Sequence, residues 1–353
     1  MPRPVPTAAR NMRFTRTSSF FATIFGLQRT TSADLSSSNT TFNPLQGIQQ
    51  FPISSYSTNM TRLAPVISLS HGGGPMPLLG DPSHAAITKS LKTKVPKILK
   101  LGTPEAPKAI VLVTAHWSTS KVTVSSGSKH ELLYDYYGFP PESYEIKHDA
   151  PGSPEVAEQV AQALKDAGIE CEKDDKRRMS SLIFPIPTVT NNTITAWDHG
   201  VFVPMKLIDP TAHVPIIQLS VLSSESPTQS YAIGRALFSL RTQNIAIISS
   251  GFATFHNLRL MFDGTSRNPE FKALNKEWSG AVTDAAMTES EQERERKFEH
   301  WRKWPGAYTM HPRGGAEHFL PLIVAAGAAA GSKGRGYADD FMGTDMWSYY
   351  WDE

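Results

Sequence analysis

Short, strongly apolar runs occur along the chain from residue 65 onward, and polar or amphipathic stretches separate them. The runs are rich in β-branched residues and are bounded by turn residues, which is the pattern of buried β-strands. They are Pro65–Leu69, Ala109–Thr114, Ile216–Leu222 and Ile245–Ile248. A fifth segment, Lys121–Ser125, alternates between polar and apolar residues and predicts a more exposed strand.

The stretches between these runs carry helix signals. Ser153-Pro154 provides an N-cap and a proline at the first helical position, and Gly168 marks the end of the same apolar face. Ser226-Pro227 repeats this start signal. Helices are therefore expected at 154–167, Tyr231–Leu240, 268–303 and Ala316–Ala330. Strands that alternate with helices predict an α/β fold, a single domain whose central, mostly parallel sheet is flanked by helices.

Residues 1–60 have a different composition from the rest. They contain five arginines and one acid, Asp34, so they carry +4 of the total net charge of +2 and leave −2 for the remainder. An Arg-rich, Ser-rich, acid-poor segment is typical of an organelle transit peptide. It equally fits a disordered extension, and Met60 is an alternative start. We therefore expect a targeting or disordered extension over 1–60 and a catalytic domain over 61–353, located in the cytoplasm, or in the mitochondrion if the extension is a transit peptide.

Composition excludes several classes of protein. Hydrophobic residues make up 40% of the 353 residues and charged residues 19%, as in ordinary globular proteins. No apolar run is long enough to span a membrane, and the nearly neutral body gives no nucleic-acid surface. Cys171 is the one cysteine, which excludes an internal disulfide and a cysteine-based zinc site.

Several histidines fall where the predicted strands end. His71 and His116 each end a strand, and His256 lies just beyond the strand that precedes it. Ligands of open α/β sheets bind beyond the carboxyl ends of the strands, so these side chains are expected at one edge of the sheet. A single histidine after a strand is usually structural. Three of them, in a chain without a cysteine pair, favour a site for zinc, iron, copper or nickel.

Other motifs allow two interpretations each. The glycines of Gly72–Pro75 either let the backbone approach a ligand or form a plain tight turn. Asp198 beside His199 either orients that imidazole or caps a helix. Glu317-His318 opens the predicted helix Ala316–Ala330, where polar residues are normally caps. The aromatic segment Tyr134–Tyr144 either lines an aromatic-binding pocket or packs on itself as an Ω-like loop.

The order of these motifs resembles that of one enzyme family. They read SHGGGP (Ser70–Pro75), AHW (Ala115–Trp117), GFP (Gly138–Pro140), APGSP (Ala150–Pro154), DHG (Asp198–Gly200), QLS (Gln218–Ser220), HNL (His256–Leu258) and EHFLPL (Glu317–Leu322). Over residues 64–345 the chain is similar to the 4,5-DOPA extradiol dioxygenases of the class III extradiol ring-cleavage superfamily.

The resemblance implies a site and a reaction. It places one divalent metal ion, Zn²⁺ or Fe²⁺, on His71, His116 and His318, and makes His256 either a fourth ligand or a catalytic base. His199 becomes the leading candidate for acid–base catalysis. The implied reactants are a small aromatic diol, with a DOPA-like catechol as the leading expectation, and dioxygen.

Two other functions use the same residues. One is a zinc-dependent hydrolase that activates water on these histidines, and the other is a non-catalytic metal-binding protein on the same fold. Three departures from the family pattern bear on the substrate or the domain division. Phe255 is an extra residue between Gly251 and His256, the Tyr134–Tyr137 cluster replaces a histidine, and the extension has no counterpart.

Overall fold

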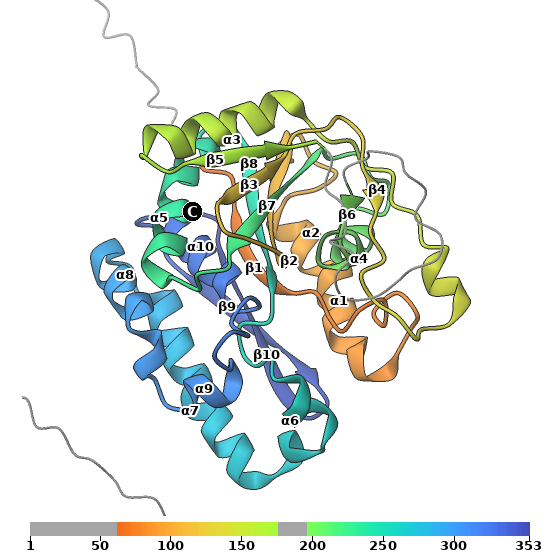
Figure 1. The fold of residues 1–353 in the computed structure, drawn as a ribbon, viewed down its shortest axis with the longest axis vertical. Coiled ribbons are helices and arrows are strands. Elements are labelled where there is room, and N and C mark those ends of the chain that lie inside the picture. The colour runs from red at the N-terminus through yellow and green to blue at the C-terminus, as the bar shows by residue number, and fades with distance from the viewer. Residues whose placement is uncertain (1–61, 176–195) are drawn as a thin grey trace, which may run out of the picture. The chain divides into compact units, whose positions relative to one another are not determined.

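The computed structural model describes residues 62–175 and 196–353. An eight-stranded sheet forms its centre (Figure 1). In spatial order its strands are β5 (Cys171–Asp174), β3 (Val122–Ser125), β7 (Ile216–Leu222), β2 (Ala109–Thr119), β8 (Ile245–Gly251), β1 (Val66–Ser70), β10 (Thr344–Trp351) and β9 (Arg335–Phe341). The four central strands β7, β2, β8 and β1 run parallel to one another, and β3, β10 and β9 pair antiparallel with their inner neighbours. The α/β prediction with a mostly parallel sheet is confirmed.

Helices cover both sides of the sheet (Figure 1). On one side lie α3 (Pro154–Asp166), α5 (Pro227–Arg241), α8 (Glu291–Glu299) and α10 (Leu320–Ala328). On the other lie α1 (Ala85–Thr93), α2 (Val95–Ile98) and α4 (His199–Ile208). The remaining elements are α6 (Leu258–Phe262), α7 (Pro269–Met287), α9 (Ala307–Met310), and the small pair β4 (Glu131–Leu132) and β6 (Ala196–Trp197). No helix in the described ranges is both long and apolar enough to cross a membrane.

The predicted helix starts are confirmed in their hydrogen bonds. The hydroxyl of Ser153 accepts from the backbone N–H of Val156, and the hydroxyl of Ser226 accepts from that of Gln229. Each serine satisfies one N–H that the first helical turn leaves without a partner. Local sequence therefore fixes where α3 and α5 begin.

Four expectations about elements need correction. β3 is buried along its whole length, because it lies inside the sheet between β5 and β7 and α3 packs against it. The hairpin of β9 and β10 was not predicted. The segment 268–303 contains two helices, α7 and α8, and a short 3-10 turn. Finally, α10 begins at Leu320, so Glu317 and His318 precede the helix.

α5 and α10 cross at two glycines. A Cβ atom on Gly234 would overlap the carbonyl oxygen of Val324 and lie 2.8 Å from the backbone nitrogen of Ala328. A Cβ on Gly327 would in turn overlap the carbonyl oxygen of Tyr231. The two helix backbones are therefore in direct contact, and α10 is held close to the sheet from which the site is built.

Two buried arginines bind the carboxyl end of α10. Arg241 donates to the carbonyl oxygens of Ala328 and Ala329 at 3.1 Å, and Arg294 donates to that of Ala326 at 3.3 Å. Cations at this end interact favourably with the helix dipole and satisfy carbonyls that the helix leaves free. Both guanidinium groups thus fix the position of α10.

Candidate active site

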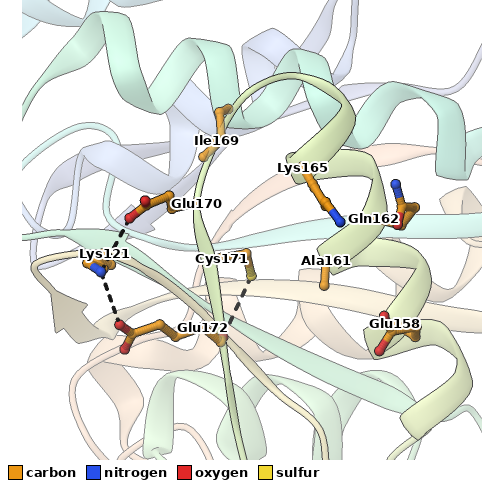
Figure 2. Close-up of a pocket in the computed structure, with 9 residues that line it drawn as sticks. All are labelled: Lys121, Glu158, Ala161, Gln162, Lys165, Ile169, Glu170, Cys171 and Glu172. Atoms are coloured by element: carbon orange, nitrogen blue, oxygen red, sulfur yellow. Dashed lines mark hydrogen bonds and ion pairs between the residues drawn. The ribbon is translucent and has the colours of Figure 1, made fainter.

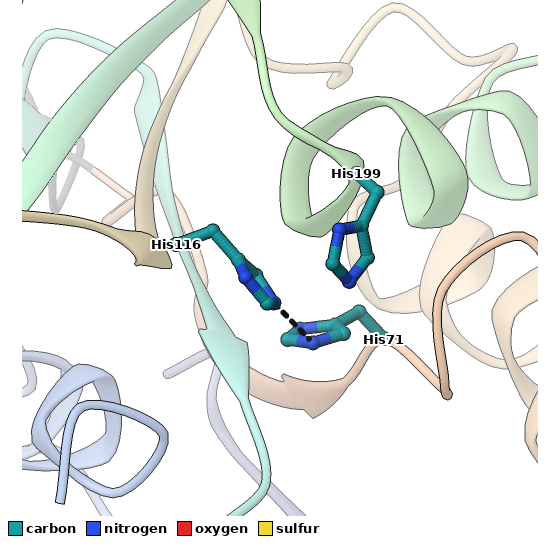
Figure 3. A group of neighbouring side chains, drawn as sticks. All are labelled: His71, His116 and His199. Atoms are coloured by element: carbon teal, nitrogen blue, oxygen red, sulfur yellow. Dashed lines mark hydrogen bonds between the residues drawn. The ribbon is translucent and has the colours of Figure 1, made fainter. Parts of the chain in front are cut away.

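Five histidines from separate elements meet at one end of the central strands. His71 follows β1, His116 lies within β2, and His199 is the first residue of α4. His256 follows β8 by a short loop, and His318 precedes α10. Figure 3 shows the imidazoles of His71, His116 and His199 directed toward one another. The structure thus brings together every histidine singled out in the sequence.

An irregularity in β2 directs His116 toward the site. β2 continues to Thr119, but its register with β7 shifts between Val113 and Ser118. Such a bulge bends a strand and changes the direction of its side chains. The apolar pattern predicted His116 at the end of a strand. In the structure it lies inside a distorted strand.

The ring nitrogens of three histidines converge. Nε2 of His116 lies 3.2 Å from Nε2 of His71 and 3.3 Å from Nε2 of His318. The ring of His256 stacks on that of His318, with centroids 3.4 Å apart. In each of two groups, His71/His116/His199 and His256/Glu317/His318, the atoms that could bind a metal lie close to one another. The two short distances of His116 join them into one centre.

The other nitrogen of each converging histidine faces an oxygen. Nδ1 of His71 lies 2.9 Å from Oγ of Ser250, which gives its own hydrogen to the carbonyl oxygen of Gly200 at 2.5 Å. Ser250 must therefore accept from His71. Nδ1 of His318 lies 2.9 Å from Oε1 of Glu317, and Nδ1 of His116 lies 3.5 Å from Oδ2 of Asp135. The two hydrogen bonds assign the ring protons of His71 and His318 to Nδ1, and a proton on Nδ1 of His116 would face the Asp135 carboxylate.

These assignments create an arrangement that a cation stabilises. A neutral imidazole with its proton on Nδ1 has a lone pair on Nε2, so in this form the lone pair of His116 faces those of His71 and His318. Metal–nitrogen bonds of about 2.0–2.1 Å at tetrahedral or octahedral angles separate neighbouring ligand nitrogens by about 2.8–3.4 Å. The observed separations of 3.2 and 3.3 Å lie in this range. His71, His116 and His318 therefore fit a divalent metal ion.

Burial gives these histidines different proton affinities. Burial and the neighbouring His116 hold the pKa of His71 well below its ordinary value, and burial with the charge of His256 does the same to the pKa of His318. Burial lowers the pKa of His256 to about 4. For His199, burial also lowers the pKa, but the adjacent Asp135 carboxylate outweighs it and the net shift is upward. Metal ligation suits the neutral rings, and proton transfer suits His199.

The carboxylate next to His199 in space is not the one next to it in sequence. Asp198 accepts from Thr114 Oγ1 at 2.8 Å and from Gln218 Nε2 at 2.5 Å. Asp135 instead accepts from Nδ1 of His199 at 2.8 Å. Sequence reasoning missed Asp135, which is 64 residues away. The sequence did contain a clue to Asp135, because it is an acid within the aromatic run YDYY, and a carboxylate among aromatic rings requires a polar partner.

The aromatic loop packs on itself, which decides between the two interpretations of Tyr134–Tyr144. The hydroxyl of Tyr134 donates to the carbonyl of Ile146, and that of Tyr136 donates to the carbonyl of Ser143. The ring of Tyr136 also comes within 5.8 Å of the His199 ring. Phe255 is fully buried against Phe271 at 4.9 Å, so this extra residue serves the core and not the pocket.

The glycine segment after His71 is a tight turn. Gly72 has a φ of +83°, and a Cβ there would overlap the ring of Pro77. The backbone N–H of Gly73 donates to Nε2 of His84 at 2.9 Å. The glycines thus permit close packing of the backbone at the end of β1. This packing holds His71, the residue just before them, in place.

A pocket lies between α3 and β5 (Figure 2). Lys121 there bridges Glu170 at 3.3 Å and Glu172 at 3.6 Å. Cys171 also lines it, but burial raises the pKa of the thiol to about 11, so the sulfur is a poor nucleophile at neutral pH. No histidine lines this pocket, and the histidine centre remains the candidate active site.

Comparisons with known proteins agree with the motifs. Residues 65–350 match the family model described as the catalytic LigB subunit of aromatic ring-opening dioxygenase. The chain is 49% identical to dioxygenase tasH of Hapsidospora irregularis, over 82% of this chain and 86% of that protein. It is 33% identical to a 4,5-DOPA dioxygenase extradiol of Beta vulgaris, over 74% of this chain and 85% of that protein. The crystal structure of an uncharacterized protein from Escherichia coli K12 superposes with a TM-score of 0.53 at 26% identity, covering 82% of this chain and 99% of that one.

Proposed function

The chain belongs to the family of aromatic ring-opening extradiol dioxygenases, and we propose that it cleaves the ring of a catechol with dioxygen in a metal-dependent reaction. The observation that carries the proposal is the convergence of Nε2 atoms from His71, His116 and His318, with each Nδ1 facing an oxygen. Ring cleavage with dioxygen requires a redox-active ion, so Fe²⁺ is the proposed catalytic metal and Zn²⁺ an inactive occupant.

The three histidines have a defined task in this proposal. They hold one divalent ion from one side, and their hydrogen-bonded Nδ1 atoms fix the direction of each ring. When bound, the ion supplies open coordination positions, acidifies the catechol hydroxyls and brings the two reactants together. Burial lowers the pKa of His71 and of His318, which keeps these two rings neutral and able to bind it.

His199 is the proposed proton-transfer residue. Its Nδ1 is occupied by Asp135, so Nε2 is the atom that accepts the second phenolic proton and later returns a proton during ring opening. Its ring centroid lies 3.9 Å from that of His116, which places it beside the proposed ligands. His256, stacked on His318, is the second candidate for this role or a fourth ligand.

The proposed substrate is a small catechol, with a DOPA-like side chain as the first compound to test. The name of the sugar-beet relative, a 4,5-DOPA dioxygenase extradiol, supports this choice. The expected product of cleavage beside the diol is a yellow semialdehyde. Tyr136, which is packed within the aromatic loop, brings that loop within 5.8 Å of the His199 ring.

The test combines metal analysis with oxygen consumption. Protein purified without oxygen is loaded with Fe²⁺ and given a panel of catechols that includes DOPA, while oxygen uptake and product absorbance are followed together. His71→Ala, His116→Ala and His318→Ala should each abolish stoichiometric metal binding. His213→Ala replaces an exposed histidine and should keep both metal and activity.

Three results contradict the proposal in different ways. Full metal occupancy in all three alanine variants would remove the ligand assignment. Failure of every catechol to cause oxygen uptake, together with hydrolysis of an ester or amide by the zinc-loaded protein, would instead indicate a zinc hydrolase. Metal binding without either reaction would indicate a non-catalytic metal-binding protein.

A further inference from the structure

We propose that Asp135 is a positioning residue that fixes the tautomer and direction of His199 and couples it to His116. The inference rests on the proposed role of His199 in proton transfer. It concerns a single carboxylate that approaches two histidines of the site from a loop far away in the sequence.

Oδ1 of Asp135 holds both the backbone and the ring of His199. It accepts from the backbone N–H of His199 at 2.9 Å and from Nδ1 of the same residue at 2.8 Å. Two hydrogen bonds to one atom restrict the rotation of the side chain as well as the position of its Cα. The Nε2 atom therefore has one direction in which to point.

This carboxylate also performs the task of a helix cap. Asp198 occupies the N-cap position of α4, but its side chain makes no capping hydrogen bond. Its oxygens accept from Thr114 and Gln218 instead. Asp135 supplies the missing acceptor at the first N–H of α4, where a negative charge also interacts favourably with the helix dipole.

The second oxygen of Asp135 faces the neighbouring imidazole. Oδ2 lies 3.5 Å from Nδ1 of His116, the residue proposed as the central metal ligand. The carboxylate is largely buried, with 16% of its side chain exposed, and the His199 side chain is 8% exposed. Electrostatic interactions in such a site are weakly screened. One group thus orients both the proposed base and a proposed ligand.

The chemical consequence is a defined proton on His199. With Nδ1–H donated to a carboxylate, the lone pair of a neutral ring is on Nε2, which is the form that a general base requires. An amide at position 135 can still accept from the backbone N–H but presents an NH₂ group as well. In serine proteases the corresponding aspartate-to-asparagine change leaves the geometry intact and lowers kcat by about 10⁴, because the histidine adopts the wrong tautomer.

The experiment compares Asp135→Asn with Asp149→Asn, which changes an exposed aspartate beyond the same loop. The first readout is the tautomer of His199, from ¹⁵N shifts of histidine-labelled full-length protein with and without added zinc, assigned with His199→Gln. Zinc is diamagnetic and permits this measurement. Asp135→Asn should lose the Nδ1–H signature of His199, and Asp149→Asn should keep it.

The second readout is kinetic, at saturating Fe²⁺ with the active catechol. Asp135→Asn should lower kcat by about 10²–10⁴ with KM changed by no more than about threefold, the separation expected when an interaction acts in the transition state. Metal affinity should fall by about 10–100-fold through His116. An unchanged tautomer, or a kcat equal to that of Asp149→Asn, overturns the proposal. The tautomer decides the question even if no catechol is turned over, so its failure is distinct from failure of the proposed function.

Discussion

Replacing Gly234 by alanine adds one methyl group at the place where α5 and α10 are in backbone contact. The new Cβ would overlap the carbonyl oxygen of Val324 and lie 2.9 Å from Cα of Gly327. Both neighbours are backbone atoms, which cannot rotate away as a side chain can. The two helices must therefore separate, and the movement of α10 is transmitted to His318 just before it.

The magnitude follows from two opposing effects. Overpacking of a core costs about 1–3 kcal/mol, and a clash with backbone lies at the upper end. Alanine is better than glycine in a helix interior by about 1 kcal/mol. Gly234→Ala should therefore lower the free energy of unfolding by about 1–2 kcal/mol. Gly280 provides the matched control, because it lies inside α7 with open space around its Cβ position. Gly280→Ala should raise the same quantity by about 0.5–1 kcal/mol.

The assay is urea denaturation followed by far-UV circular dichroism on both variants. Opposite signs of the change are expected, and the two changes should differ by about 1.5–3 kcal/mol. Equal effects of the two substitutions would refute the reasoning, because helix propensity alone would then explain both. Gly234→Ala should also weaken metal binding through His318, whereas Gly280→Ala should not.

Three further predictions concern the site, acid stability and the extension. His199→Gln should keep the bound metal while turnover falls about 10²–10⁴-fold in the oxygen-uptake assay; loss of metal would make His199 a ligand. Burial, then the charge of Lys206, lowers the pKa of His148 to about 4, and neither ring nitrogen has a hydrogen-bond partner. The neutral ring stabilises the fold above pH 6.5, and this stability is lost as the pH falls through 6.5 toward 4. About 2 kcal/mol should be gone at pH 5, and His148→Gln should abolish that part of the loss in urea titrations at pH 7 and 5. Residues 1–60 lie outside the described residues; a protein starting at Met60 should retain the full-length turnover, and insolubility would contradict the domain division.

The sequence predicted what depends on local pattern. The buried strands appear as apolar runs because both faces of β7 and β8 are covered, and the serine caps mark the first turns of α3 and α5. The strand-end rule placed His71 in the site because parallel strands end together. The roles of His199 and His318 came from family resemblance and not from spacing.

What the sequence could not predict depends on contacts between distant segments. The hairpin of β9 and β10 carries polar residues because its outer strand is only partly buried, so no apolar run marks it. The bulge in β2 arises from pairing with β7 and has no local signature. Asp135 was missed for the same reason: its partner lies 64 residues further on, and the adjacent Asp198 was the apparent choice.

The order of strands in the sheet determines when, during synthesis of the enzyme, each strand can pair with its neighbours. β1 is made early but pairs with β8 and β10, and His116 meets His318 across 202 residues. At about 5–20 residues per second a ribosome needs about 10–40 s to make that interval. During this time the nascent chain has apolar strands without their neighbours, and the histidine centre does not yet exist. With the proposed ligands, a metal ion would therefore be acquired only after the segment carrying His318 has emerged.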